Sequence, residues 1–104
     1  MSIWKTPKPD LESLSSLQAR TMASHLGIEI VGCTGDSLTA RMPVDHRTLQ
    51  PHGRLHGGAS VALAETVGSI AANMVLDPND HIGVGLEINA NHVRPVKDGF
   101  VFAT

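Results

Sequence analysis

The stretch HGGASVALAETVGSIAANMVL, residues 56–76, decides the fold of this chain. It is long, dense in alanine and valine, and closed by Asp77-Pro78, and after His56 its one ionisable side chain is Glu65. Such a run predicts a helix that is apolar on nearly every side, while the carboxylate, hydroxyls and glycines disfavour a membrane span. In a small domain, the element that wraps such a helix is a curved sheet.

The flanking sequence predicts the strands of that sheet and a helical cover. Upstream, the expected elements are a short helix capped by Asp10 and running to about Arg20, a helical turn over 21–26 ended by Gly27, and a hairpin of strands 28–33 and 38–44 joined by 34–37. Downstream, after a loop over 45–55 and the long helix, they are a long strand over 82–95 and a strand from Gly99 that is still in progress at Thr104. We expect a single α+β domain over residues 1–104.

Length and composition exclude several classes of protein. A chain of 104 residues fits one domain, and so small a core favours association with a second subunit. A net charge of −2 gives no field for nucleic acid. A single cysteine, Cys33, and an N-terminus without the apolar run of an export signal predict a reducing, cytoplasmic location and no membrane partner.

Glu65 is the first candidate for chemistry, because burying a lone carboxylate costs free energy unless the group is partnered or has a task. On helical spacing it shares a face with mostly small side chains, and Ser69 lies one turn further along. These small side chains leave room beside the Glu65 carboxylate. Ser69 either holds a water there or bonds back to its own preceding turn. The structural alternative places Glu65 on an exposed stripe or in a subunit contact.

The glycines at the start of the helix are the second candidate. The first backbone N–H groups of a helix have no partner within it and lie at the positive end of its dipole. Gly57 and Gly58 therefore favour an anionic oxygen, although the pair also suits a helix start that only needs tight packing. Donors aimed at a developing oxyanion contribute roughly 3 kcal/mol each in mutational tests. Gln50, in the loop upstream, is a candidate amide donor to the same oxygen.

Other patterns are less specific. His46, His52 and His56 lie near one another, but in a loop and without the spacing of a zinc motif, so we predict no metal. Residues 57–60 do not match the nucleophile elbow of serine hydrolases. Gly83-Val84-Gly85 lacks the third glycine of a dinucleotide loop, which favours strand packing and no cofactor.

Three motifs in order carry a family resemblance: QPHGRLHGGAS (50–60), AETVGS (64–69) and LEINANHVRP (86–95). They resemble hotdog-fold acyl-CoA thioesterases of the phenylacetate and 4-hydroxybenzoyl-CoA type. Within that group, the chain looks most like the bacterial branch that acts on 1,4-dihydroxy-2-naphthoyl-CoA or clears mischarged aryl carriers in enterobactin synthesis. The similarity runs over nearly all 104 residues.

The resemblance implies a long central helix wrapped by an antiparallel sheet, and subunits that pair their sheets edge to edge as a homodimer or homotetramer. The active sites would lie at the dimer interface and take an acyl-CoA substrate. Glu65 would be the nucleophile or general base. The other residues that the resemblance places in the site are Gly57 for the thioester oxygen, Gln50 and His56 of the other subunit for polarising it, Ser69 for water, and His92 and Gly58 along the substrate.

Members of this family normally continue past the strand that is running at Thr104, so we expect a sheet that lacks its C-terminal strands. Three or four strands would leave part of the helix uncovered. Two other functions stay open beside hydrolysis. One is a non-catalytic hotdog module that binds acyl-CoA, and the other is a hotdog hydratase, which needs a histidine opposite the acid.

Overall fold

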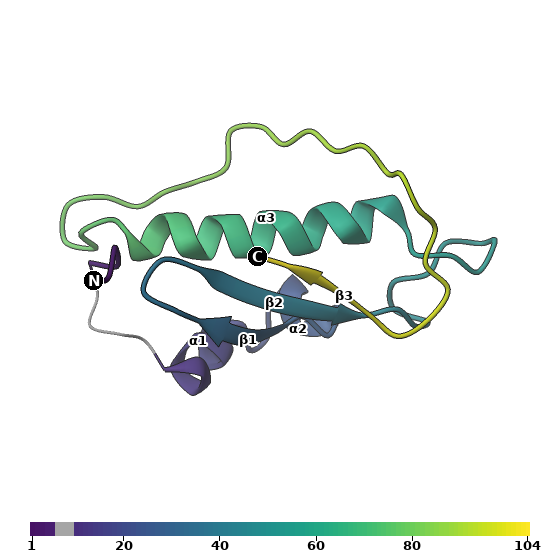
Figure 1. Cartoon of the computed structure of the whole chain (residues 1–104), viewed down its shortest axis with the longest axis horizontal. Coiled ribbons are helices and arrows are strands. Elements are labelled where there is room, and N and C mark those ends of the chain that lie inside the picture. Colours follow the sequence, from purple (N-terminus) through teal and green to yellow (C-terminus); the bar gives the residue numbers. More distant parts are fainter. Residues whose placement is uncertain (6–9) are drawn as a thin grey trace.

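A long helix lies along a three-stranded antiparallel sheet in the computed structural model, which describes residues 1–5 and 10–104 (Figure 1). The elements in chain order are α1 (Leu11–Leu17), α2 (Met22–His25), β1 (Glu29–Cys33), β2 (Leu38–Pro43), α3 (Gly57–Met74) and β3 (Phe100–Ala103). The strands neighbour one another in the order β1-β2-β3. Residues 6–9 of the polar N-terminal stretch lie outside the described residues. Of the helices described, none is both long and apolar enough to cross a membrane.

The N-terminal helices follow the predicted signals closely. Asp10 caps α1, and its carboxylate accepts a hydrogen bond of 2.6 Å from the Ser13 N–H. The helix ends at Leu17, earlier than the predicted Arg20, which instead has a positive φ of 63°. Gly27, with φ 77°, follows α2 as expected. A left-handed backbone favours glycine, so this position sets the entry into β1.

The hairpin of β1 and β2 is confirmed, and β2 carries the inner face of the sheet. Leu38, Ala40 and Met42 are buried while the residues between them are half-buried, which is the alternation that the sequence predicts. Ala40 and Met42 are 0% exposed. β3 pairs with β2 on the other side, Ala103 opposite Ala40 and Phe100 opposite Pro43.

One face of α3 packs on this sheet and the opposite face is only partly covered. The buried residues of the helix are Ala59, Leu63, Val67 and Met74, whose spacing marks a single stripe. The small residues of the other side, Ala64, Gly68 and Ala72, are exposed. As predicted, three strands do not surround the helix.

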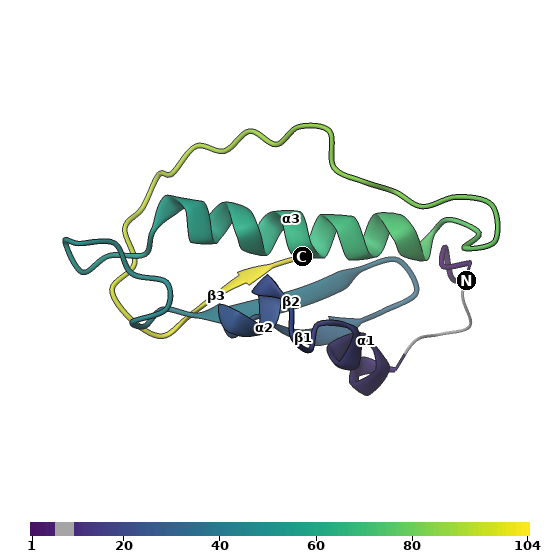
Figure 2. The same cartoon turned by 180° about the vertical axis from the view of Figure 1, so that it is seen from behind.

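The predicted strand over 82–95 is wrong for the part of the chain that the structure describes. The segment is extended but has no strand pairing, and it passes along the side of α3 that faces away from the sheet (Figures 1 and 2). Ile82, Val84 and Leu86 are 79%, 82% and 100% exposed. The alternation of apolar residues is real, but a strand also needs a neighbour to receive its backbone hydrogen bonds, and none lies alongside.

Candidate active site

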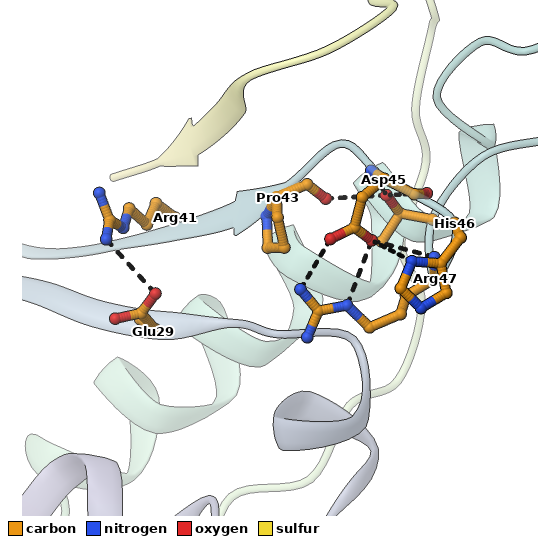
Figure 3. Close-up of polar contacts among 7 residues, drawn as sticks. Glu29, Arg41, Pro43, Asp45, His46 and Arg47 are labelled. Atoms are coloured by element: carbon orange, nitrogen blue, oxygen red, sulfur yellow. Dashed lines mark hydrogen bonds and ion pairs between the residues drawn. The ribbon is translucent and has the colours of Figure 1, made fainter.

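The loop that leads into α3 is anchored by a compact polar cluster at the end of β2 (Figure 3). The Arg47 guanidinium donates two hydrogen bonds to the Asp45 carboxylate, from Nε at 3.1 Å and from Nη2 at 2.7 Å. The Thr48 hydroxyl donates to the Pro43 carbonyl at 2.8 Å, and the Thr48 carbonyl accepts the His56 N–H at 2.8 Å. The cluster therefore ties the sheet to the residue that caps α3.

We expect this cluster to make stability depend on pH at acidic values. Hydrogen bonds from the side chain and backbone of Arg47 lower the pKa of Asp45 from 3.8 to about 2. Because the folded-state pKa is the lower one, the contribution is fully present above about pH 4 and is lost as the pH falls towards 2. In denaturant unfolding, the difference in free energy between wild type and Asp45→Asn should therefore shrink over this range.

The other titrating groups are present in both proteins. Their contributions to the pH dependence of stability therefore cancel in the difference between wild type and Asp45→Asn. Asp10, whose pKa is lowered by the hydrogen bond from the Ser13 N–H, is present in both and cancels. A difference between wild type and Asp45→Asn that stays constant with pH would contradict the assignment. Both side chains of the ion pair are about one-third exposed, so the effect will weaken with added salt.

His56 caps α3 with its side chain, which leaves one glycine amide free. The Nδ1 atom of His56 accepts the Gly58 N–H at 2.8 Å, so in the neutral ring the proton is on Nε2, which is a donor. The amide of Gly58 is thereby engaged. The Gly57 N–H makes no hydrogen bond among the described residues. Of the two glycines predicted to hold an oxygen, Gly57 alone has an available donor.

Gly57 and His92 meet in a cavity of about 380 Å³ that Gln50 also lines. A Cβ atom at position 57 would lie 2.8 Å from Nε2 of His92, so only glycine leaves room for the imidazole. The side-chain oxygen of Gln50 accepts the His52 N–H within the loop. Its amide nitrogen makes no hydrogen bond in the described chain. Three predicted site residues thus gather at the start of the helix.

Glu65 and Ser69 form a pair one turn apart on α3. The Ser69 hydroxyl donates to the Glu65 carboxylate at 3.2 Å rather than to a carbonyl of the preceding turn. Thr66 shows the contrast, since its hydroxyl bonds back to the Ala62 carbonyl at 2.6 Å. Glu65 is half-buried, which excludes the exposed stripe considered from the sequence. The carboxylate is therefore oriented by a neighbouring hydroxyl.

The pair opens into a second cavity, of about 240 Å³, whose floor on α3 has small side chains. Its other wall is the segment 83–88. A Cβ atom at Gly85 would collide with the Glu65 carboxylate, so the backbone passes directly over the acid there. Sequence reasoning assigned Gly83 and Gly85 to strand packing and missed this wall. The sequence signal for this close approach of the backbone was the presence of glycine at both 83 and 85, two positions apart in an extended segment.

The two groups of residues do not converge within one chain. Gly57 and Glu65 are eight residues apart on the same helix, a separation of about 12 Å along its axis at 1.5 Å per residue. A thioester carbonyl that accepts a hydrogen bond from Gly57 is thus out of reach of the carboxylate of the same chain. The structure therefore presents two candidate half-sites, one at the start of α3 and one at its middle.

A family model and two similar crystal structures all point to thioesterases. Residues 52–104 match the family described as the thioesterase superfamily. A thioesterase from Haemophilus influenzae of known crystal structure superposes with a TM-score of 0.88 at 52% identity, covering 96% of this chain and 68% of that one. A mutant thioesterase from Pseudomonas aeruginosa superposes with a TM-score of 0.93 at 48% identity, covering 97% of this chain and 72% of that one.

A relative with a named activity is also similar. The 1,4-dihydroxy-2-naphthoyl-CoA hydrolase of Escherichia coli is 48% identical over 99 residues, which are 95% of this chain and 71% of the relative. Both the identity and the shared architecture extend through α3 and the sheet beneath it. The chain therefore belongs to the thioesterase superfamily, a family of hydrolases with the hotdog fold.

Proposed function

We propose that this chain hydrolyses the thioester of an acyl-CoA or an acyl carrier that bears an aromatic or medium-length acyl group, with Glu65 as nucleophile or general base. The observation that carries the proposal is the pair of Glu65 and Ser69. It combines a half-buried carboxylate in the middle of an apolar helix, an orienting hydroxyl at 3.2 Å, and a cavity with a floor of small side chains. Such a carboxylate is poorly explained by packing alone.

The chemistry needs little more than a carboxylate and a site for negative charge. Hydrolysis of a thioester expels a thiolate, whose conjugate acid has a pKa of about 8.5 by comparison with cysteine, so no strong general acid is required. In one route Glu65 attacks the carbonyl carbon, expels the thiolate and leaves an anhydride that water opens. In the other, Glu65 takes a proton from a water that attacks the carbonyl. Ser69 would hold the carboxylate or that water in position to attack the carbonyl carbon.

The start of α3 offers the donors for the oxygen of the thioester. The N–H of Gly57, which makes no hydrogen bond among the described residues, lies at the positive end of the helix dipole, where developing negative charge is stabilised. The amide nitrogen of Gln50 and the Nε2–H of His56 are the further donors in this proposal. His92, packed against Gly57, would line the acyl group beside them.

We propose that a second copy of the chain completes each site. The separation of about 12 Å between the half-sites of one helix supports a site in which the glycine donor and the carboxylate come from different chains. The segment 82–95 is a suitable contact, because its apolar side chains are exposed and most of its backbone is unpaired. The proposed assembly is a homodimer, or a homotetramer made of two such dimers.

One relative supports the proposed substrate class, and the single cysteine is consistent with the proposed cytoplasmic location. The Escherichia coli relative is named for an aromatic acyl-CoA, and its identity of 48% over 95% of this chain favours an aromatic group here. Cys33 is a free, half-buried thiol, which is consistent with the reducing environment of the cytoplasm, where acyl-CoA is found.

The test is a thiol-release assay with a panel of acyl-CoAs. The panel includes aromatic, medium-chain and long-chain acyl groups, and released CoA is trapped by a thiol reagent. We expect turnover that is highest with the aromatic or medium-length groups. Calorimetric binding of intact acyl-CoA without thiol release would instead identify a non-catalytic module. A change in enoyl-CoA absorbance without thiol release would identify a hydratase, and either result would contradict the proposal.

A further inference from the structure

Asn73, near the end of α3, holds the segment that passes over the helix. Its Nδ2 donates to the Gly83 carbonyl at 3.0 Å, and its Oδ1 accepts the Gly83 N–H at 2.7 Å. The same Nδ2 also donates to the Ser69 carbonyl at 2.9 Å, which fixes the amide on the helix. The exchange with Gly83 uses the two backbone groups that a neighbouring strand would otherwise pair.

Among the described residues, only Asn73 holds this segment by hydrogen bonds to the rest of the chain. In the part of the chain that the structure describes, the two bonds between Asn73 and Gly83 are the only hydrogen bonds that join residues 82–95 to the rest of the chain. The flanking side chains add little packing, because Ile82 and Val84 are 79% and 82% exposed. Hydrogen bonds therefore join this segment to α3 at Gly83, while its other end lies against the start of the helix through the contact of His92 with Gly57.

The contact between Asn73 and Gly83 is close to the proposed catalytic acid, Glu65. Gly83 lies two residues before Gly85, whose backbone covers the Glu65 carboxylate so closely that a Cβ atom would collide with it. A Cβ atom at Gly83 would lie 3.4 Å from Leu76 and 3.5 Å from the Asn73 amide, so the segment is near the helix at both glycines. The carboxylate is thus confined between the Ser69 hydroxyl and the backbone at Gly85.

We propose that Asn73 is a positioning residue for thioester hydrolysis, which holds Gly83 to Gly85 over the helix and so confines the Glu65 carboxylate in its reactive orientation. The proposal rests on the proposed function. Asn73 itself does not line the cavity that contains Glu65. Releasing the segment lets the carboxylate swing away from the carbonyl, and a displacement of about 1 Å at a reacting group costs up to about 100-fold in rate.

The test replaces the Asn73 amide by an apolar side chain of the same branching and, separately, by a longer amide. Asn73→Leu removes the three hydrogen bonds. Asn73→Gln keeps the amide oxygen and nitrogen but places them one methylene further from the backbone. Asn79→Leu is the matched control, since Asn79 is also exposed and its side chain makes no hydrogen bond among the described residues. For each protein, kcat and KM are measured with the best acyl-CoA of the panel, together with the thermal midpoint and hydrogen–deuterium exchange over residues 82–88.

We expect Asn73→Leu to lower kcat about 10-fold with a smaller change in KM, and to speed exchange at Gly83 while the midpoint shifts little. Asn73→Gln should recover part of kcat, and Asn79→Leu should match wild type. A kcat for Asn73→Leu equal to that of wild type, or one lowered only in proportion to the folded fraction, would overturn the inference. Unchanged exchange at Gly83 would overturn it as well. Absence of thioesterase activity in wild type would remove the proposed function instead, while the exchange data still decide whether Asn73 holds the segment.

Discussion

Replacing Glu65 by glutamine is expected to lower kcat for thioester hydrolysis by about 10²- to 10⁴-fold, the range that a positioned acid or base contributes. The amide keeps the size of the side chain and can still accept the hydrogen bond from Ser69. It neither takes a proton from water at neutral pH nor forms an anhydride. The measurement is thiol release at saturating acyl-CoA, with binding of the intact substrate followed separately by calorimetry.

The control for this prediction is a surface acid far from the cavity. Glu12, on the exposed side of α1, is replaced in the same way. Glu12→Gln should turn over substrate like wild type, and both variants should keep the circular dichroism spectrum of the folded protein. A Glu65→Gln protein that is folded and as active as wild type would remove the carboxylate from the mechanism.

Mixing two inactive variants is expected to restore activity. If each site combines Glu65 of one chain with Gln50 of another, then Glu65→Gln and Gln50→Ala fail for different reasons. Dissociating and reassembling an equal mixture makes half of the dimers mixed, and each mixed dimer has one site with both native groups. Activity should then rise from near background to about one-quarter of wild type, as the two-fold symmetry of the dimer requires.

The result of this experiment distinguishes a site formed within one chain from a site shared by two chains. The separation of about 12 Å along α3 predicts that the half-sites of one chain never cooperate. If the mixture stays at background after exchange of subunits, verified by a mass-tagged chain, the shared site is wrong. Each variant taken alone through the same dissociation and reassembly should remain inactive, which controls for reactivation by refolding.

Local patterns predicted most of the elements correctly. The cap at Asp10, the break at Gly27 and the helix from Gly57 each depend on the conformation of a few adjacent residues, and the structure confirms them. The position of Ser69 beside Glu65 follows in the same way from a spacing of one helical turn, although the sequence did not predict the hydrogen bond between them. Such features need no information about distant parts of the chain.

The strand over 82–95 shows where local patterns fail. Its alternating apolar residues satisfy the rule for one face of a sheet, yet a strand is formed by hydrogen bonds to a neighbour. That neighbour is not encoded within the segment. The role of Asn73 was missed for the same reason, because its partner Gly83 lies ten residues further along and across a turn.

In this protein, residue order alone was enough to place Glu65 beside Ser69 on an apolar helix and Gln50 in the loop before its glycine start, since both arrangements involve near neighbours in the chain. Only the folded chain places His92 against Gly57 and the backbone of Gly85 over the carboxylate. These contacts join segments that are far apart in sequence, and their positions are set by the packing of α3 on the sheet and by the path of the chain around it. No local preference of a few residues determines that path.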